Sequence, residues 1–168
     1  MKIKSYELIL TLTGFQLTWL FCIFGEYYNF SSAGLFVGIT YLSIFFYLSN
    51  NKYKIMKLCF IFSVIGYTFD SVIAFSKLFI INSNIIIGFL PIWFLILWPS
   101  FSTLFVYVLT FLKNRPILAF IMGAIIVPPT YYLGIPLGLA SSSNIILAMV
   151  IMSFFWGLFL TFYTFYIR

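Results

Sequence analysis

The sequence predicts an all-α fold, a polytopic bundle of six transmembrane helices with both termini in the cytoplasm. Of its 168 residues, 64% are hydrophobic and only 7% are charged, so the chain lacks the charge with which a soluble domain covers its surface. Its mean hydropathy is +1.15. The Lys and Arg residues lie in short gaps between apolar runs, which is where membrane topology places them.

Each expected span is an apolar run close to the ~20 residues that a helix needs to cross a bilayer core. The six runs are residues 8–25, 33–48, 55–75, 91–112, 117–139 and 145–166. Short polar connections separate them at 29–32, 49–52, 113–116 and 141–144. The first run follows two lysines, as a signal peptide would, but it lacks a small-residue cleavage pattern and is expected to be retained. We therefore expect one integral membrane domain over residues 1–168.

The distribution of cations predicts the orientation. If the N-terminus is cytoplasmic, one of the Lys and Arg residues, Lys77, lies on the outer side of the membrane. Eight lie inside: Lys2, Lys4, Lys52, Lys54, Lys57, Lys113, Arg115 and Arg168. This bias towards the cytoplasmic side is typical of membrane proteins, and it favours six spans with both ends inside.

The segment 78–90 does not fit this series of spans. It is apolar but too short to cross a bilayer, and Asn82, Ser83 and Asn84 interrupt it. We expect it at the outer interface, either extended or re-entrant. The alternative joins its second half to the fourth span, giving one long tilted helix from Ile85 to Leu112 that is broken near Pro91 and Pro99.

Composition excludes several classes of function. The chain has no histidine and only three acids, Glu7, Glu26 and Asp70, which argues against a metal site, and we expect no metal and no cofactor. Cys22 and Cys59 lie inside apolar runs and are expected to pack as small hydrophobic residues. The net charge of +6 comes from cations dispersed between the spans, so we expect membrane lipids as partners and no nucleic acid.

Small and polar residues recur at helical spacing in the spans, and such stripes mark helix–helix seams in lipid. In the first span the stripe is Thr11, Gly14, Thr18, Cys22 and Gly25; in the second it is Gly34, Gly38 and Tyr41; in the third it is Cys59, Ser63, Gly66, Asp70 and Ala74. The stripes predict bundle packing or, alternatively, the lining of a polar cavity. Gln16 lies nearly opposite the first stripe, which predicts a central first helix.

Asp70 is the leading candidate for a functional residue, because an ionised carboxylate inside a membrane costs roughly 2.5–3.5 kcal/mol and so faces a partner in the protein. Three interpretations compete. Asp70 is a structural hydrogen-bond hub bonded to Gln16, Thr or Tyr groups; or it is hydrated near the interface; or it acts in proton transfer, substrate binding or catalysis. For the last, Gln16 and Tyr67 are the other candidate catalytic residues.

Two further features concern the helix ends and the fifth span. Glu26, Trp93 and Trp98 are interpreted as interfacial residues near the outer membrane surface. Pro128 and Pro129 remove backbone donors in the middle of the fifth span. They predict a broken helix, either a plain kink or part of a binding site.

An ordered set of residues resembles a known family. It comprises Phe15, Gln16, Trp19 and Gly25; Gly66 and Asp70; Pro91, Trp93, Leu97, Trp98 and Phe101; Leu112, Arg115 and Pro116; and Gly123, Pro129, Gly134 and Gly138. Together they resemble the bacterial inner-membrane proteins grouped as domain of unknown function 2878. The resemblance departs at one point, because Val106-Tyr107 stands where the family pattern has Asn-His.

The resemblance implies a multi-pass protein of the bacterial inner membrane. It also implies a link to membrane-lipid modification, because genes of this family lie near those of cyclopropane-fatty-acid-synthase-like enzymes. Two functions remain open. One is an accessory or scaffold protein that binds another membrane protein or a lipid-modifying enzyme. The other is a small membrane enzyme or transporter for a lipid or hydrophobic substrate, with Asp70 in its site.

Overall fold

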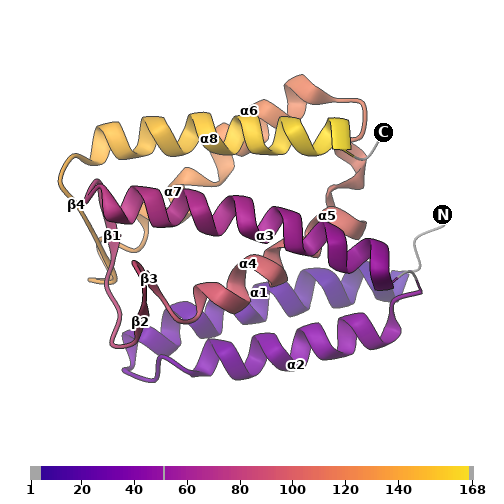
Figure 1. Cartoon of the computed structure of the whole chain (residues 1–168), viewed down its shortest axis with the longest axis horizontal. Helices are drawn as coiled ribbons and strands as arrows, with labels where there is room; N and C mark the ends of the chain where they lie inside the picture. Colours follow the sequence, from indigo (N-terminus) through magenta and orange to yellow (C-terminus); the bar gives the residue numbers. More distant parts are fainter. Residues whose placement is uncertain (1–4, 51, 167–168) are drawn as a thin grey trace. The chain divides into compact units, whose positions relative to one another are not determined.

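The computed structural model describes residues 5–50 and 52–166, which fold into two compact units. Unit 1 comprises residues 1–71 and 83–108, and unit 2 comprises residues 72–82 and 109–168. Figure 1 shows that the helices dominate and the strands are short. The elements are α1 (Ser5–Tyr27), α2 (Ala33–Leu48), α3 (Lys52–Phe75), β1 (Phe79–Ile81), β2 (Ile86–Ile87), β3 (Leu90–Pro91), α4 (Phe94–Ser102), α5 (Leu104–Tyr107), the 3-10 helix η1 (Leu109–Leu112), α6 (Pro116–Ile126), α7 (Pro128–Tyr132), β4 (Ala140–Ser142) and α8 (Ile145–Tyr166).

Helices α1 and α2 of unit 1 form an antiparallel pair joined by a tight turn. At the end of α1, the Phe30 amide donates to the Gly25 carbonyl at 2.6 Å and the Asn29 amide to the Glu26 carbonyl at 3.0 Å. Asn29 has a φ of 60°, so the helix ends in a Schellman motif with Asn in the left-handed position. This motif reverses the chain directly after Glu26.

The expected stripes of small residues form the seam between α1 and α2. Every member of the stripe in the first span and of that in the second is buried. A Cβ on Gly14 would overlap the ring of Tyr41, and one on Gly34 would overlap Cys22. The prediction of bundle packing is therefore confirmed for these two helices.

Helices α4 and α5 pack on the other helices of unit 1. The Trp98 ring lies against Gly66 of α3, and the Phe62 and Phe105 ring centroids are 4.6 Å apart. The continuous helix expected over 91–112 is wrong, because the chain forms α4, α5 and η1 instead. Pro99 lies inside α4, which continues past it to Ser102, and the interruption comes at Thr103, whose hydroxyl donates to the Ser100 carbonyl at 2.7 Å. Such local bonds compete with the regular helical pattern.

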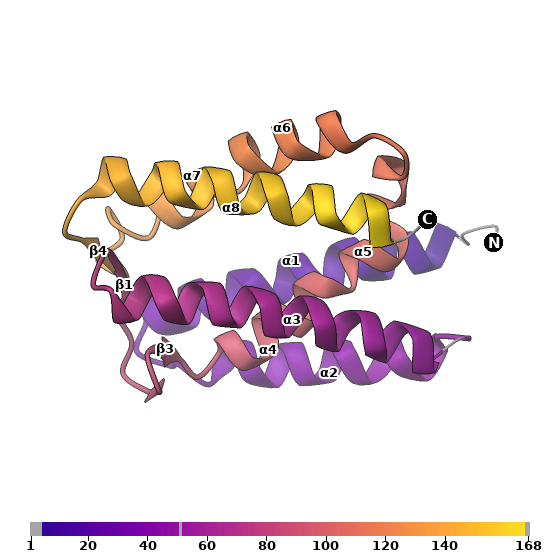
Figure 2. The ribbon, with the colours of Figure 1, turned by 45° about the horizontal axis from the view of Figure 1, so that its top comes forward.

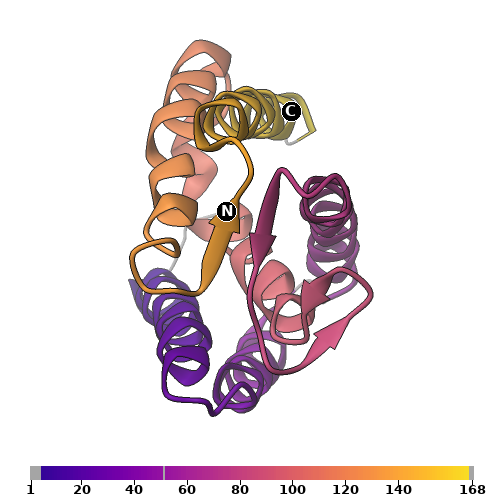
Figure 3. The ribbon, with the colours of Figure 1, turned by 90° about the vertical axis from the view of Figure 1, so that its left-hand side faces the viewer.

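The segment between α3 and α4 is extended, as one of the two alternatives predicted. Strands β2 and β3 pair antiparallel, with Ile86 opposite Pro91 and Ile87 opposite Leu90. Helix α4 begins only at Phe94, so the alternative of one helix from Ile85 to Leu112 is wrong. Figure 3 views the end of unit 1 at which α1 ends and α2 begins, and it shows this hairpin at that end.

Unit 2 is built on the antiparallel pair α6 and α8, which Figure 2 shows side by side. A Cβ on Gly123 would overlap the backbone carbonyl of Trp156, so the two helices approach at this glycine as closely as their backbones allow. Strands β1 and β4 pair antiparallel, with Ile80 opposite Ser141. The Thr161 hydroxyl donates to the Pro116 carbonyl at 3.3 Å at the other end of the helix pair.

The fifth expected span, residues 117–139, is shorter and broken. Helix α6 ends at Ile126 and α7 begins at Pro128, which confirms the predicted break at the proline pair. The helical part ends at Tyr132, and Gly138 has a φ of 73°, a conformation that suits a loop rather than a helix. Pro136 lies between these points and cannot continue a hydrogen-bonded helix.

Three of the described helices are long and apolar enough to cross a membrane. They cover residues 6–27, 52–75 and 145–166. The other apolar helical stretches, residues 33–48, 94–107 and 116–132, have 10–17 residues each. Two helices begin earlier than expected: α1 begins at Ser5 instead of residue 8, and α3 begins at Lys52 instead of residue 55.

The close approach at Gly123 predicts a loss of stability in the Gly123→Ala variant. The added methyl group meets backbone atoms that cannot rotate away, and overpacking of this kind costs about 1–3 kcal/mol. We expect a lower unfolding temperature in detergent, followed by tryptophan fluorescence. The control is Ile125→Leu, at a side chain that is 66% exposed, and it should leave the unfolding temperature unchanged. Equal stability of Gly123→Ala and wild type would contradict the packing described.

Candidate functional site

Glu26 lies at the C-terminal end of α1, and it is only 5% exposed. Its two carboxylate oxygens accept four hydrogen bonds. Oε1 accepts from the Ser31 hydroxyl at 3.0 Å and from the Asn84 amide at 2.8 Å. Oε2 accepts from the Ser83 hydroxyl at 2.8 Å and from the Trp93 indole Nε1–H at 3.0 Å. Each oxygen thus has two donors, which occupies the lone pairs of the carboxylate.

These donors come from both sides of the β2–β3 hairpin, so Glu26 joins that hairpin to the end of α1. Ser83 and Asn84 precede β2, and Trp93 follows β3. The Asn84 side chain adds a 3.2 Å bond to Asn29 Oδ1 in the turn after α1. We call Glu26, Ser31, Ser83, Asn84 and Trp93 the Glu26 clamp.

Sequence reasoning missed this clamp. It interpreted Glu26 and Trp93 as interfacial side chains, yet Trp93 is only 2% exposed. The available signal was the group Asn82-Ser83-Asn84, three polar residues in an otherwise apolar segment without an obvious use. A buried Trp also requires an acceptor for its N–H, and acids are scarce in this chain.

Asp70 of α3 is 3% exposed, so the interpretation of a hydrated side chain is wrong. The Trp98 Nε1–H donates to Asp70 Oδ2 at 2.8 Å. Trp98 is itself buried and packs against Gly66, one turn before Asp70. Gly66 leaves the space in which the indole reaches the carboxylate. This geometry fits the structural hub, with a tryptophan partner in place of the Gln, Thr or Tyr partners considered from the sequence.

The other two candidate catalytic residues have different surroundings. The Tyr67 hydroxyl donates to the Ile87 carbonyl at 3.4 Å, so it supports the hairpin. Gln16 lies in the middle of α1 on its exposed face, away from the buried stripe of Thr11, Gly14 and Thr18. A catalytic role of Asp70, Gln16 or Tyr67 remains a prediction.

Hydroxyl groups form a second polar seam inside unit 1. The Tyr41 hydroxyl and Thr103 Oγ1 are 2.5 Å apart, and the hydroxyls of Ser63 and Ser102 are 3.4 Å apart. Ser100 Oγ is buried and has no hydrogen-bond partner among the residues that the structure describes. These neutral groups link α2 and α3 to the α4–α5 segment, which is the usual role of hydroxyls between membrane helices.

The third acid, Glu7, lies near the start of α1 at the opposite end of unit 1 and is 7% exposed. The Tyr107 hydroxyl is in hydrogen-bonding contact with the side chains of Glu7 and Ser49. A small pocket at this position is lined by Tyr6, Glu7, Leu10, Phe45, Leu48, Ser49 and Tyr107. All three acids of the chain are therefore buried in unit 1.

The donor set limits what these acids do chemically. Glu26 is held by two hydroxyls, one amide and one indole, and its oxygens have no lone pair left for a substrate proton. Within residues 5–50 and 52–166, no group of three His, Cys, Asp or Glu side chains is placed to hold a metal ion. The arrangement is suited to fixing helices and a hairpin in place.

The Asp70–Trp98 bond predicts that Trp98→Phe destabilises the protein. Phenylalanine lacks the indole N–H that donates to the buried carboxylate, and a bond of this kind contributes about 1.5–3 kcal/mol. It also lacks the outer indole atoms that lie against Gly66, which adds to the loss. We expect a lower unfolding temperature for Trp98→Phe than for Asp70→Asn, since the Asn oxygen still accepts from Trp98. A double-mutant cycle with Trp98→Phe and Asp70→Ala measures the coupling. Additive losses would show that the bond contributes nothing.

The Glu26 clamp predicts that Glu26→Ala frees the hairpin. The substitution removes the acceptor of the Ser31 hydroxyl, the Asn84 amide and the Trp93 indole, while the Ser83 hydroxyl keeps the Ile85 carbonyl as an acceptor at 3.1 Å. The amides of residues 84–92 should therefore exchange with deuterium faster than in wild type. Hydrogen–deuterium exchange in detergent measures this, with α8 peptides as the internal reference. Glu26→Gln keeps one acceptor oxygen and should give an intermediate rate. Unchanged exchange at Asn84 in Glu26→Ala would contradict the role of the clamp.

Comparison with known proteins adds one relationship. A family model described as a protein of unknown function (DUF2878) matches residues 8–162. No curated protein and no solved structure matches the chain. The match covers nearly all of both units and confirms the resemblance seen in the sequence. The chain belongs to the DUF2878 family of proteins of unknown function.

Proposed function

We propose that this chain is a multi-pass protein of the bacterial inner membrane that serves as a non-catalytic scaffold or accessory component. Its partner in this proposal is another membrane protein or a lipid-modifying enzyme. The observation that carries the proposal is that the carboxylates of Glu26 and Asp70 are buried and accept hydrogen bonds from donors of the protein itself.

The exposed side chains support the bilayer as the solvent. Helix α8 exposes Ile146 at 76%, Val150 at 60% and Phe154 at 61%. Helix α3 exposes Phe60 at 71%, and α6 exposes Ile117 at 76%. A soluble protein would present polar side chains at such positions, whereas lipid tails favour apolar ones.

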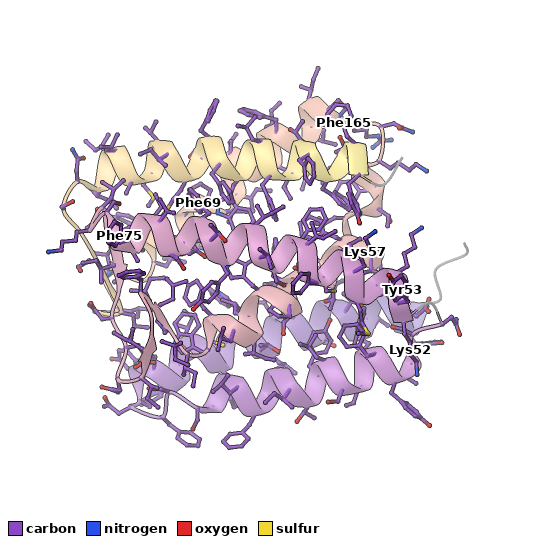
Figure 4. The ribbon with its side chains drawn as sticks, viewed as in Figure 1. Lys52, Tyr53, Lys57, Phe69, Phe75 and Phe165 are labelled. Atoms are coloured by element: carbon purple, nitrogen blue, oxygen red, sulfur yellow. The ribbon has the colours of Figure 1, made fainter. Side chains whose placement is uncertain are left out.

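Within each unit, the cationic turns lie at one end, which supports the proposed crossings. Tyr6, Leu48 and Tyr107 line the same pocket, so α1 begins where α2 and α5 end. Figure 4 shows Lys52 and Lys57 at the N-terminal end of α3 and Phe75 at its other end. In unit 2, the contact between Thr161 and Pro116 places the cationic turn at 113–115 beside the C-terminal part of α8. Strand β1, which follows Lys77, lies at the opposite end of that unit.

The link to lipid modification rests on the family resemblance. A scaffold for such an enzyme requires a stable apolar surface and no reactive groups of its own. The alternative, an enzyme or transporter with Asp70 in its site, requires Asp70 to exchange its bond with Trp98 for one with a substrate. The Asp70→Asn test below separates these functions.

The proposed topology predicts which single cysteines react with a membrane-impermeant thiol reagent added outside intact cells. Lys77→Cys should be labelled, and Tyr53→Cys should be labelled only after the membrane is permeabilised. Both positions are exposed, and the native Cys22 and Cys59 are buried, so wild type serves as the blank. Labelling of Tyr53→Cys in intact cells would reverse the orientation.

The scaffold proposal predicts that Asp70→Asn keeps biological activity once it folds. The Asn oxygen retains the bond to Trp98, so the partner should still co-purify in mild detergent and the membrane lipid composition should match wild type. A strain without the gene provides the reference for that composition. Full-length, folded Asp70→Asn that leaves the lipid composition like the deletion strain would support the enzyme or transporter instead.

A further inference from the structure

The tip of the β2–β3 hairpin exposes a compact group of large apolar side chains. Ile85 is 45% exposed, Ile86 53%, Ile87 46% and Phe89 52%. Gly88 completes the turn with a φ of 66°, and a Cβ there would meet nothing within 4 Å. No charged residue occurs between Lys77 and Lys113. We call Ile85, Ile86, Ile87, Gly88 and Phe89 the hairpin tip.

The hairpin tip is held in a fixed position. The Glu26 clamp binds the residues immediately before and after the hairpin with bonds of 2.8–3.0 Å. Leu90 and Pro91 of β3 are buried, so the base of the hairpin is packed while its tip is exposed. A disordered segment would not be held by four hydrogen bonds to a buried carboxylate. The hairpin is therefore an ordered part of unit 1.

The position of the tip along α3 indicates its depth. The Ile87 carbonyl accepts from the Tyr67 hydroxyl, and Tyr67 lies eight residues before Phe75, where α3 ends. Eight residues correspond to ~12 Å of helix. If α3 crosses the bilayer, the tip lies at the level of the acyl chains near one membrane surface.

Backbone groups at the base of the tip have partners within the protein. Irregular backbone at membrane depth is tolerated only where its polar groups have partners. The Ile85 carbonyl accepts from the Ile92 amide at 3.0 Å, and the Ile87 carbonyl accepts from Tyr67. Residue 91 is a proline, which has no amide hydrogen to satisfy. The side chains that remain exposed carry no hydrogen-bonding group.

We propose that the hairpin tip is a re-entrant lipid-binding element, which places Ile86, Ile87 and Phe89 among the acyl chains of the bilayer with the Glu26 clamp fixing its depth. The proposal rests on the proposed membrane placement of α3. Lipid is the occupant that fits this surface. The tip carries no charge, and it lies at the level of a helix that is long enough to cross a membrane. Its side chains also carry no group that would give a protein partner specificity. The nearby Tyr27 and Tyr28, 49% and 73% exposed, suit the interface at the same end of α1.

The test uses an environment-sensitive nitrobenzoxadiazole (NBD) label on Phe89→Cys in full-length protein, reconstituted in phosphatidylcholine nanodiscs. Lipids with a doxyl quencher at carbon 5 of the acyl chain report contact at this depth. We expect blue-shifted emission that the doxyl lipids roughly halve, as for a residue buried near the headgroup–acyl boundary. Lys77→Cys, exposed beyond the end of α3, is the control and should keep water-like emission that soluble iodide quenches.

A second measurement tests the role of the clamp. In the Glu26→Gln, Phe89→Cys background the doxyl quenching should fall and iodide quenching should rise, since the hairpin loses part of its attachment. Gln is used because it is the milder substitution should Glu26→Ala fail to fold. Equal quenching in both backgrounds would overturn the role of the clamp in setting depth.

Other outcomes would overturn lipid binding itself. Water-like emission from Phe89→Cys would place the tip in solvent. Shielding from both iodide and doxyl lipid, with cross-linking of the label site to a second copy or to another protein, would assign the tip to a protein interface. These results are independent of orientation: lipid contact by Phe89 with Tyr53 accessible from outside would refute the proposed topology but leave this inference standing.

Discussion

A buried polar group in a chain with so apolar a surface depends on a partner within the protein, and this constraint governs unit 1. Water is absent from a bilayer core, so an unpaired carboxylate or indole there raises the free energy of the folded state. In unit 1, two of the three acids are paired with tryptophans. Glu26 accepts from Trp93, and Asp70 accepts from Trp98. Because both tryptophans belong to the 83–108 segment, these pairs attach that segment to α1 and α3.

Close backbone approach is the second means of association in both units. Gly14 and Gly34 allow α1 and α2 to meet, and Gly123 allows α6 and α8 to meet. Each glycine removes a side chain from a contact that would otherwise hold the backbones apart, which increases dispersion contact in the absence of a hydrophobic driving force. Gly66 combines this effect with the acid pairing, since it provides the space for the Trp98 ring beside Asp70.

The same interactions inform the functional proposals. A carboxylate occupied by four protein donors fixes geometry and has little capacity for proton transfer, which favours a scaffold over an enzyme. The clamp also explains how an apolar hairpin stays ordered while its tip is exposed. A fixed apolar element beside a membrane helix is a means of binding lipid that requires no catalytic residue. Asp70 and Glu26 thus have related structural tasks at two places in unit 1.

The sequence by itself determined the apolar character, the order of the helices, the packed stripes of α1 and α2 and the break at Pro128. These features follow from the composition, from the helical spacing of the small residues and from the chemistry of proline. All three are properties of residues close together in the sequence. Only the tertiary structure decided that Trp98 is the partner of Asp70, that Glu26 holds the hairpin, and that the fourth span breaks into α4, α5 and η1. Those outcomes depend on contacts between residues 28 to 67 positions apart, such as Asp70 with Trp98 and Glu26 with Trp93. The spacing of residues in the sequence predicts the helix face on which a donor lies. It does not predict which acceptor, distant in the sequence, that donor contacts in the folded protein.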